Sequence, residues 1–309
     1  MNAYSKIFWG MCSLTVCGVA QAALPTALYD NFNASPLLNP LKWFGGGNTS
    51  ARANLENIRS IVSHPTLGNR LRLYSRGFGD KRLNSGARLG SNNLNFSNPG
   101  AITAIKASVW PMSATVQGCT GSSDLGQVRT RLAGSFFNTR MSISGDATND
   151  VFAGIQLQRV SNSTDAPNVF RVVYFVSICR DSGCFNLTDL KRAEIGTSVS
   201  LGQKVILSLN WDKAKKSFIF GRDAQSTVYK YTVSDTSVPG VDFKVLQSSH
   251  YAVNCVRAIP PTAAMDAYLD DIYTNLLPAS SATNADMNES SLEHNISGSD
   301  SSVAPFGGI

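Results

Sequence analysis

The chain has 309 residues, with 27 lysines and arginines against 21 aspartates and glutamates, a formal net charge of +6. Beyond residue 22 no run is long and apolar enough to cross a bilayer, for which a helix needs about 20 residues. The composition therefore excludes a helical membrane span after that point and predicts a soluble mature chain.

The first 22 residues have the pattern of an export signal. Lys6 gives a positive start, residues 7–19 are largely apolar, and residues 20–22 (Ala-Gln-Ala) match a cleavage site. A membrane anchor is the alternative, but about 13 apolar residues are too few to span a bilayer. A lipoprotein signal at Cys17 is disfavoured because a bulky valine precedes the cysteine. We expect cleavage near Ala22 and a secreted or periplasmic protein.

The rest of the chain divides by composition. Residues 23–278 hold 26 of the 27 basic residues but 17 of the 21 acidic ones, a balance of +9. Residues 279–309 are rich in Ser and Asn, acidic and without Lys or Arg, so we expect a disordered tail that buries no core. A basic domain favours anionic partners such as acidic polysaccharide. A soluble surface with no electrostatic task is the alternative.

From residue 67 onward, short strand-like runs alternate with polar turns and almost no helical periodicity. Apolar and polar residues alternate at period two, as in half-buried strands. A glycine-rich segment, residues 76–86, predicts a loop, because no helix pattern follows its Gly-Phe-Gly. The pattern predicts an all-β fold of two packed antiparallel sheets, a β-sandwich in residues 23–278. The predicted strands are 67–74, 101–112, 128–137, 152–160, 170–180, 205–211, 218–222, 228–233 and 265–275.

Removal of the signal leaves four cysteines, Cys119, Cys179, Cys184 and Cys255. An even number in an oxidising compartment indicates disulfide bonds, and three pairings are possible. A four-residue turn between strand-like flanks favours a Cys179–Cys184 bridge, which leaves Cys119 for Cys255. A zinc site is the alternative, but the chain has only three histidines and none is close in sequence to a cysteine.

Three segments carry a family resemblance. Residues 28–43 open with Leu-Tyr-Asp-Asn-Phe and end at Lys-Trp, residues 210–220 begin Asn-Trp-Asp and end Phe-Ile-Phe, and residues 269–273 read Leu-Asp-Asp-Ile-Tyr. These segments resemble the opening, a hairpin and the closing strand of concanavalin-A-like lectin and glucanase sandwiches. The resemblance implies a jelly roll whose first and last strands lie side by side. The order of motifs also resembles a group of uncharacterised secreted bacterial proteins.

The same resemblance implies a possible metal site. Sandwiches of this family often hold one structural Ca²⁺ where the first and last strands meet. Asp270 matches the aspartate used there, and Asp30 is placed to approach from the first strand. Calcium takes six to eight oxygen ligands, which backbone and water oxygens would complete. The alternative is that both aspartates cap turns or pair with arginines.

Two kinds of polysaccharide-cleaving enzyme with this fold have recognisable sequence motifs. Laminarinase-type hydrolases of this fold carry E-x-D-x-(x)-E on one strand, which sets two carboxylates beside one glycosidic bond. The folded region has only Glu56 and Glu194, far apart in sequence, so that chemistry is excluded. Residues 127–131 and 156–158 resemble the arginine strand and the Q-x-H strand of jelly-roll alginate lyases. The resemblance is incomplete, because Gln158 stands where the histidine would be and an amide does not shuttle protons.

Four polar side chains remain as candidate ligand-binding residues. Arg129 and Arg131 alternate with apolar neighbours, as do Gln156 and Gln158. If the apolar set faces the core, all four face outward, where guanidinium and amide groups suit carboxylates and sugar hydroxyls. The alternative is the solvated face of a sandwich.

Other sites have weaker signals. There is no G-x-S-x-G motif, and His64 and His250 lack an identifiable Ser or Asp partner, so both are expected to be structural or on the surface. Arg70, Arg72 and Arg76 lie beside aromatic residues, but no nucleic-acid-binding module surrounds them, and we expect no nucleic-acid partner.

The sequence thus predicts an exported, disulfide-bonded β-sandwich that binds a carbohydrate or cell-surface glycan without catalysis. It predicts no catalytic residue and no cofactor other than the calcium ion. An enzyme of unfamiliar mechanism that acts on a polysaccharide is the first alternative. A matrix protein with no small ligand is the second. Oligomeric state has no signal in the sequence.

Overall fold

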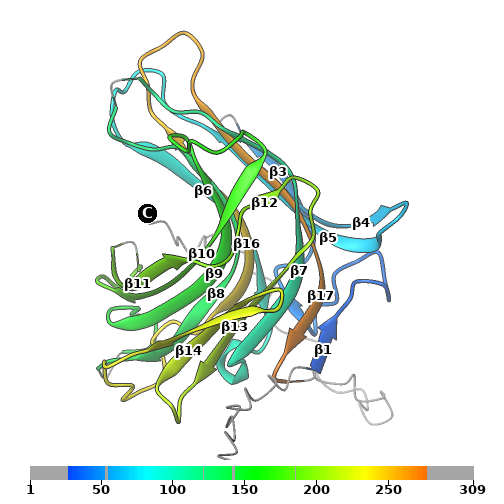
Figure 1. The fold of residues 1–309 in the computed structure, drawn as a ribbon, viewed down its shortest axis with the longest axis vertical. Helices are drawn as coiled ribbons and strands as arrows, with labels where there is room; N and C mark the ends of the chain where they lie inside the picture. Colours follow the sequence, from blue (N-terminus) through cyan, green and yellow to red (C-terminus); the bar gives the residue numbers. More distant parts are fainter. Residues whose placement is uncertain (1–26, 53–54, 121, 141–142, 185, 277–309) are drawn as a thin grey trace, which may run out of the picture.

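The computed structural model describes residues 27–276 except 53–54, 121, 141–142 and 185, and these residues form a two-sheet antiparallel β-sandwich (Figure 1). A single 3₁₀ turn, Pro99–Ala101, is the one helical element of this part of the chain. The strands are β1 Ala27–Asp30, β2 Trp43–Phe44, β3 Asn48–Arg52, β4 Leu55–His64, β5 Gly68–Phe78, β6 Ala87–Phe96, β7 Ala104–Val116, β8 Gln127–Asn138, β9 Asp150–Val160, β10 Val169–Cys179, β11 Leu187–Glu194, β12 Val199–Ser200, β13 Val205–Asp212, β14 Ser217–Arg222, β15 Gln225–Lys230, β16 Lys244–Val253 and β17 Thr262–Thr274. The all-β jelly-roll sandwich predicted from the sequence is confirmed.

The two sheets differ in strand order and in curvature. One sheet has the order β15-β14-β13-β7-β17-β5-β4-β3, with β1 paired to β17. The other has the order β11-β10-β9-β8-β16-β6-β2, with β12 paired to β10. This second sheet curves so that the face turned away from the core is concave, and we call that side the concave face (Figure 1).

The first and last strands lie side by side, as the resemblance implied. Leu28 pairs with Tyr273, and Asp30 pairs with Ile272. An aromatic cluster holds this junction, because Trp43 lies 4.7 Å from Phe96 between ring centroids and its Nε1 donates to Asp30 Oδ2 at 2.7 Å. The opening segment therefore docks into the sandwich through aromatic packing together with strand pairing.

Period-two alternation separates the core from the concave face. On β8, Val128 and Leu132 are fully buried in the main core between the sheets, whereas Arg129 and Arg131 point to the opposite side. On β9, Ile155 and Leu157 face the core, and Gln156 and Gln158 lie on the side of the arginines. A second, smaller apolar cluster lies on the concave side around Ala133, Phe152, Phe175 and Val245.

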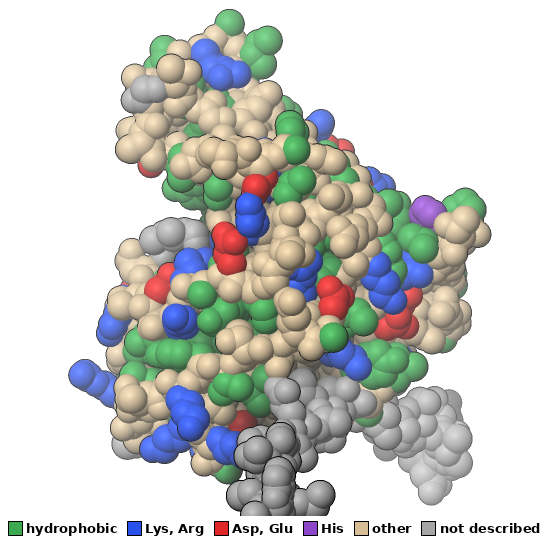
Figure 2. Space-filling model, viewed as in Figure 1, with side chains coloured by type: hydrophobic (Ala, Val, Ile, Leu, Met, Phe, Trp, Pro, Cys, Tyr) green, Lys and Arg blue, Asp and Glu red, His purple; other side chains and the backbone are tan. Residues whose placement is uncertain are grey.

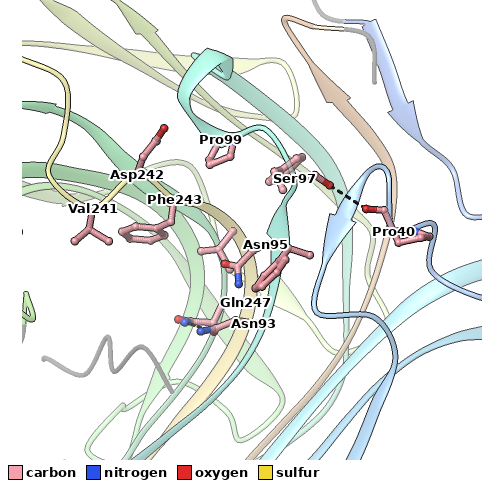
Figure 3. Close-up of a pocket in the computed structure, with 12 residues that line it drawn as sticks. Pro40, Asn93, Asn95, Ser97, Pro99, Val241, Asp242, Phe243 and Gln247 are labelled. Atoms are coloured by element: carbon pink, nitrogen blue, oxygen red, sulfur yellow. Dashed lines mark hydrogen bonds between the residues drawn. The ribbon is translucent and has the colours of Figure 1, made fainter. Parts of the chain in front are cut away.

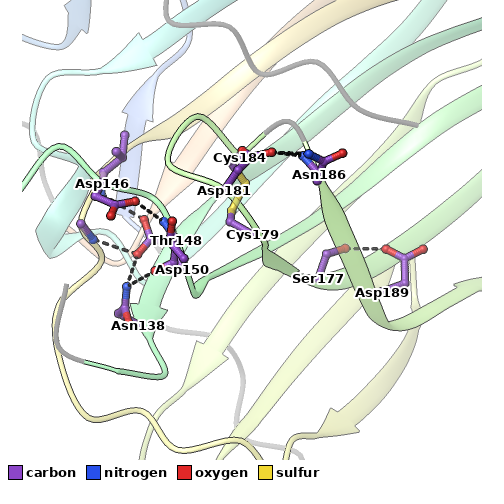
Figure 4. The surroundings of a disulfide bond; sticks show 12 residues. Asn138, Asp146, Thr148, Asp150, Ser177, Cys179, Asp181, Cys184, Asn186 and Asp189 are labelled. Atoms are coloured by element: carbon purple, nitrogen blue, oxygen red, sulfur yellow. Dashed lines mark hydrogen bonds between the residues drawn. A yellow bond between two sulfur atoms is a disulfide. The ribbon is translucent and has the colours of Figure 1, made fainter. Parts of the chain in front are cut away.

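Both predicted disulfides are present. Cys179–Cys184 closes the turn that follows β10, and Cys119–Cys255 joins segments 136 residues apart. Figure 4 shows the local bridge, where Asp181 accepts from the backbone N–H of Asn186 at 2.9 Å. The Asn149 N–H donates to the Cys179 carbonyl at 2.9 Å, so this bridged turn is fixed against the segment that leads into β9.

The glycine-rich segment was only partly predicted. Gly77 and Phe78 belong to β5, and the loop comprises residues 79–86. A side chain at Gly77 would place its Cβ 2.1 Å from the ring of His250, and one at Gly90 would lie 2.3 Å from it. Both glycines thus admit the buried imidazole, whose Nδ1 lies 2.8 Å from Ser75 Oγ. The glycine at position 77 therefore serves packing within a strand and does not begin the turn.

Four strands of eight or more residues were not predicted, namely β4, β6, β11 and β16. Each lacks clear alternation: β6 reads Gly, Asn, Leu on its core side and Ser, Asn, Asn on the other, so both faces are polar.

The predicted export signal and the predicted acidic tail lie outside the described residues. No helix among residues that the structure describes is long and apolar enough to span a membrane.

The close approach around His250 gives a stability prediction. We expect Gly90→Ala to lower the free energy of unfolding by about 1–3 kcal/mol, because the added methyl group overpacks against the imidazole ring. Gly47→Ala is the matched control, since its nearest neighbour, a backbone oxygen, lies at an ordinary 3.5 Å. Denaturant unfolding of both variants measures the difference, and an equal loss in both would contradict this packing.

The same histidine predicts a pH dependence. Burial lowers the pKa of His250 to about 4, whereas an unfolded histidine titrates near 6.5. Between these pH values the unfolded chain binds the proton and the folded chain does not, so stability falls as the pH drops. Relative to His250→Gln, the native protein should lose about 3 kcal/mol between pH 7 and pH 4. Parallel stability curves for the two proteins over that range would show that His250 does not titrate this way.

Candidate functional site

A row of polar side chains crosses the middle of the concave face. Strand pairing sets Asn93 of β6 opposite Gln247 of β16, Gln247 opposite Arg131 of β8, and Arg131 opposite Gln156 of β9. The row continues through Val173 of β10 to Glu194 of β11. We call Asn93, Gln247, Arg131, Gln156 and Glu194 the polar row. Directly opposed residues in antiparallel strands have Cβ atoms about 5 Å apart, so neighbouring side chains touch.

Two arginines on this face are buried and repel each other. Arg129 and Arg131 are each only 4% exposed. Burial lowers the pKa of Arg129 to about 10, and the charge of Arg192 on β11 adds to that effect. Burial also holds the pKa of Arg131 well below its usual value, with further contributions from the charges of Arg129 and Arg192. Three guanidinium groups therefore share one region, which we call the arginine cluster.

The arginine cluster has contacts with aromatic rings, with one carboxylate and with one hydroxyl group. The Arg131 guanidinium lies 5.2 Å from the ring centroid of Phe152, and that of Arg192 lies 5.2 Å from the ring of Phe175. Asp189 accepts from Arg192 Nε at 2.7 Å and also from the Ser177 hydroxyl. Arg129 Nε donates to the neutral Ser249 hydroxyl at 2.8 Å. Cation–π contacts offset part of the desolvation cost of the guanidinium groups but supply no counter-charge.

Three buried polar atoms of the polar row have no hydrogen-bond partner. They are Arg131 Nε, Gln156 Oε1 and Gln247 Oε1. The amide nitrogens of the two glutamines are engaged, one donating to Gln158 and the other to Asn93. A free donor therefore lies in the same row as two free acceptors. Unsatisfied buried groups are rare in native proteins because each costs about 1–3 kcal/mol.

A pocket adjoins one end of the polar row. Its volume is about 380 Å³, and its lining includes Asn93, Asn95, Gln247, Phe243 and Phe44. Figure 3 shows Asn93, Asn95 and Gln247 together, with Phe243 beside them. Phe44 comes from the edge strand β2 opposite Asn95 and is 72% exposed. An exposed aromatic ring beside amide groups offers an apolar surface and hydrogen bonds in one place.

A second pocket of about 380 Å³ lies at the other end of the polar row. Gln158, Val173, Arg171 and Glu194 contribute to its lining. Arg171 pairs with Asp165 at 2.6 Å and more loosely with Glu194 at 3.6 Å. The polar row therefore runs from one pocket to the other across the arginine cluster.

The structure brings together all four predicted ligand-binding residues. Arg129 pairs with Gln158, and Arg131 pairs with Gln156, on adjacent strands. Sequence reasoning missed their partners Asn93, Gln247 and Arg192, which lie on β6, β16 and β11, strands that were not predicted. Phe44 was missed as well. The one sequence signal for Phe44 was its position directly after Trp43, at the end of the opening motif.

The predicted calcium ligands are held in other contacts. Asp30 accepts from Trp43 Nε1 and lies 3.4 Å from Lys42 Nζ. Asp270 accepts from Arg70 Nη1 at 2.8 Å. Each carboxylate already has a cationic partner, which suits the stated alternative better than a metal ion. Among the described residues no group of three or more His, Cys, Asp or Glu gathers as metal ligands. Calcium binding stays a prediction.

Neither His250 nor His64 lies beside side chains in a catalytic arrangement. His250 is enclosed between the sheets beside Ser75, and Gly77 and Gly90 flank its ring. His64 contacts Thr66 in the turn after β4. Carboxylates are also sparse on the concave face: Asp189 is bound to Arg192 and Ser177, and Glu194 lies at the edge. A pair of free carboxylates flanking one bond is absent among the residues described there.

Comparison with known proteins gives similarity of fold. No protein-family model matches the chain, and no curated protein matches it. A glycoside hydrolase family 16 endo-glucanase from Bacteroides ovatus covers 79% of this chain and 97% of its own, at 12% identity and a TM-score of 0.45. A laminarinase from Flavobacterium sp. UMI-01 covers 80% and 99%, at 11% identity and a TM-score of 0.37. A family 7 alginate lyase covers 70% and 82%, at 12% identity and a TM-score of 0.32.

These neighbours correct the main functional prediction. A binding module without catalysis was expected, but the similar solved structures named above are glucan hydrolases and a lyase. They agree better with the alternative, an enzyme that acts on a polysaccharide. At these identities the likeness is one of fold, so the chemistry rests on the side chains of the concave face.

The arginine cluster predicts an unusual response to mutation. We expect Arg131→Met to raise the free energy of unfolding of the ligand-free protein by about 1–4 kcal/mol, because it removes a buried, poorly compensated charge while keeping the apolar volume. Arg171→Met, on β10 opposite Gln158, is the control, since Arg171 lies on the same face but is paired with Asp165 and more exposed. Denaturant unfolding in the absence of glycan gives both values. A loss of stability in Arg131→Met would mean that the charge is already compensated.

Proposed function

We propose that the chain is an exported enzyme that acts on an acidic polysaccharide bound across the concave face. The observation that carries the proposal is Arg131, which is buried beside the charges of Arg129 and Arg192 and whose Nε has no hydrogen-bond partner. An anion beside Arg131 offsets the cost of burying this charge, and guanidinium pairs with carboxylate or sulfate through directed hydrogen bonds. An acid group of the polymer is the anion that suits this position.

The polar row supports a sugar as the bearer of that acid group. Arg131 Nε is a free donor, and Gln156 Oε1 and Gln247 Oε1 are free acceptors. A simple anion accepts hydrogen bonds but donates none, so it satisfies the arginine alone. A sugar hydroxyl both donates and accepts. A uronic acid therefore meets all three groups, its carboxylate at Arg131 and its hydroxyls at the glutamines.

The pocket beside Phe44 supports a chain of sugars rather than a single one. Its amide groups continue the polar row, and its volume of about 380 Å³ adjoins the arginine cluster through Gln247. The exposed Phe44 ring gives the apolar face of a neighbouring sugar a surface to pack on. Ligand sites commonly combine an apolar lining with a few polar groups in this way.

The side chains support elimination as the reaction. Neutralising the carboxylate makes the proton on the adjacent carbon easier to remove. A base in its deprotonated form takes that proton, the electron pair forms a carbon–carbon double bond as the bond to the glycosidic oxygen breaks, and the protonated base then gives its proton to the leaving oxygen. We assign the base to Tyr251, which faces the concave side opposite Gln127 and one same-face step, about 7 Å, from Ser249. A tyrosine serves where histidine and paired carboxylates are missing.

We also propose that the protein is located outside the cytoplasm. The two disulfides support it, because such bonds persist in oxidising compartments. Salt should weaken substrate binding, since the partly exposed charges of the groove are screened over about 8 Å at physiological ionic strength.

Product analysis tests the reaction. On uronate-containing polysaccharides we expect unsaturated uronic acid ends, visible by their ultraviolet absorbance. Tyr251→Phe should reduce kcat by at least about 100-fold with little change in substrate binding, because it removes only the proton-transferring hydroxyl. Tyr273→Phe, on the opposite sheet, is the control. Cleavage that yields new reducing ends without unsaturation would replace elimination with hydrolysis.

A double substitution tests the site itself. Arg129→Ala with Arg131→Ala should abolish binding of acidic polysaccharide while the circular dichroism spectrum stays that of the parent. Affinity electrophoresis in gels containing the polymer gives the binding directly. If the double variant binds as tightly as the parent, the polysaccharide site lies elsewhere on the protein.

A further inference from the structure

The ends of β5, β6, β16 and β17 extend beyond the rest of the sandwich as an arm (Figure 1). Three loops form its tip, namely residues 79–86, 117–126 without residue 121, and 254–261. The arm lies at the end of the molecule away from the pocket beside Phe44, and no residue of its tip loops belongs to the polar row or the arginine cluster. Its surface chemistry is therefore separate from the proposed catalytic site.

Aliphatic side chains are exposed together at this tip. Leu83 is 52% exposed, Val256 62% and Ile259 73%, and all three come from the first and third loops. In Figure 2 hydrophobic and basic side chains appear together at the end of the arm. Exposed apolar residues that gather in one place mark interaction sites more often than scattered ones do.

The aliphatic residues are surrounded by cations. The three loops together with Arg88, at the start of β6, hold Lys81, Arg82, Arg88 and Arg257 against only Asp80 and Asp124. A pocket of about 410 Å³ opens between the first and third loops. Lys81, Arg82 and Arg88 line it together with Asp80, which forms ion pairs with both arginines. The Arg82 side chain is 79% exposed, so its charge is available to a partner even though it contacts Asp80.

The tip is held firmly by contacts between its loops. The Cys255 N–H donates to the Asp80 carbonyl at 3.0 Å, and the Asp80 N–H donates to Asn254 Oδ1. The disulfide Cys119–Cys255 ties the second loop to the third, and Asp124 accepts from the Gly86 N–H at 2.7 Å. The exposed aliphatic side chains therefore lie on loops that hydrogen bonds and a disulfide hold together.

We propose that the tip of the arm docks on an anionic phospholipid bilayer, with Leu83, Val256 and Ile259 entering the interface and the basic pocket receiving a lipid phosphate. The combination matches what a membrane surface requires, since apolar insertion and attraction of basic residues to anionic headgroups together give stable binding where either alone is marginal. A projecting tip suits a deformable bilayer better than a protein partner, because stable protein interfaces bury about 800 Å² on each side.

Vesicle sedimentation with the full chain tests the proposal. We expect binding to vesicles of phosphatidylcholine and phosphatidylglycerol in equal parts, and weak binding to phosphatidylcholine alone. Leu83→Asp with Ile259→Asp should weaken binding to the anionic vesicles by roughly tenfold or more, as should Lys81→Glu with Arg82→Glu. Val238→Asp is the matched control, since Val238 is 79% exposed and lies next to the far end of β8, about 36 Å along that strand from the tip.

A spectroscopic readout separates insertion from simple charge attraction. Ile259→Trp should show a blue shift of its fluorescence on the anionic vesicles, after subtraction of the native protein's signal. All substituted residues are exposed, and circular dichroism checks that each variant folds. The proposal is overturned if the protein does not bind the anionic vesicles. It is equally overturned if only the charge reversal weakens binding and inorganic phosphate competes fully, because the tip then holds a soluble anion.

Discussion

The concave face is organised around the buried guanidinium group of Arg131, which lies close to the charges of Arg129 and Arg192. Arg129 and Arg131 are buried on one strand, and Arg192 approaches from the sheet edge. A sandwich with an apolar side chain in place of Arg131 would be more stable, because a buried charge whose hydrogen bonds are incomplete costs more than it returns. Strain of this kind is kept at sites where a ligand relieves it. The cluster is therefore the strongest indication of function in the described part of the chain.

The sandwich supplies the rigidity that such a site needs. The main core holds β8 and β9 from beneath through Leu132 and Ile155, so their outward neighbours cannot turn away from one another. Phe152 and Phe175 pack beside Arg131 and fix its position from the side. The bridged turn at Cys179 anchors the end of β10 close to the same aromatic residues. Preorganised charges act on a substrate without further rearrangement, which is how an enzyme stabilises a developing charge.

Much of the fold follows from the sequence because alternation in residues 128–160 and the closing segment is strong. The four residues Arg129, Arg131, Gln156 and Gln158 followed from the same parity rule. What could not be predicted lies on strands whose two faces are both polar. On the core side as well, β6 carries Asn92 and β16 carries Ser248, which bonds to Thr130 of β8. Arg192 and Phe44 belong to edge strands, whose sequence carries no signal of which sheet they join. The function was predicted without catalysis because the base that we propose, a tyrosine, leaves no sequence motif.

The central claim is that an acid group of the ligand binds the guanidinium groups of the arginine cluster. The thermal midpoint of unfolding tests this claim most directly. Saturating uronic acid oligosaccharides should raise the midpoint, because a ligand that binds only the folded state stabilises it. Neutral oligosaccharides of equal length should have little effect, and Arg131→Met should abolish the rise. An equal rise with neutral oligosaccharides, or an undiminished rise in Arg131→Met, would contradict the account.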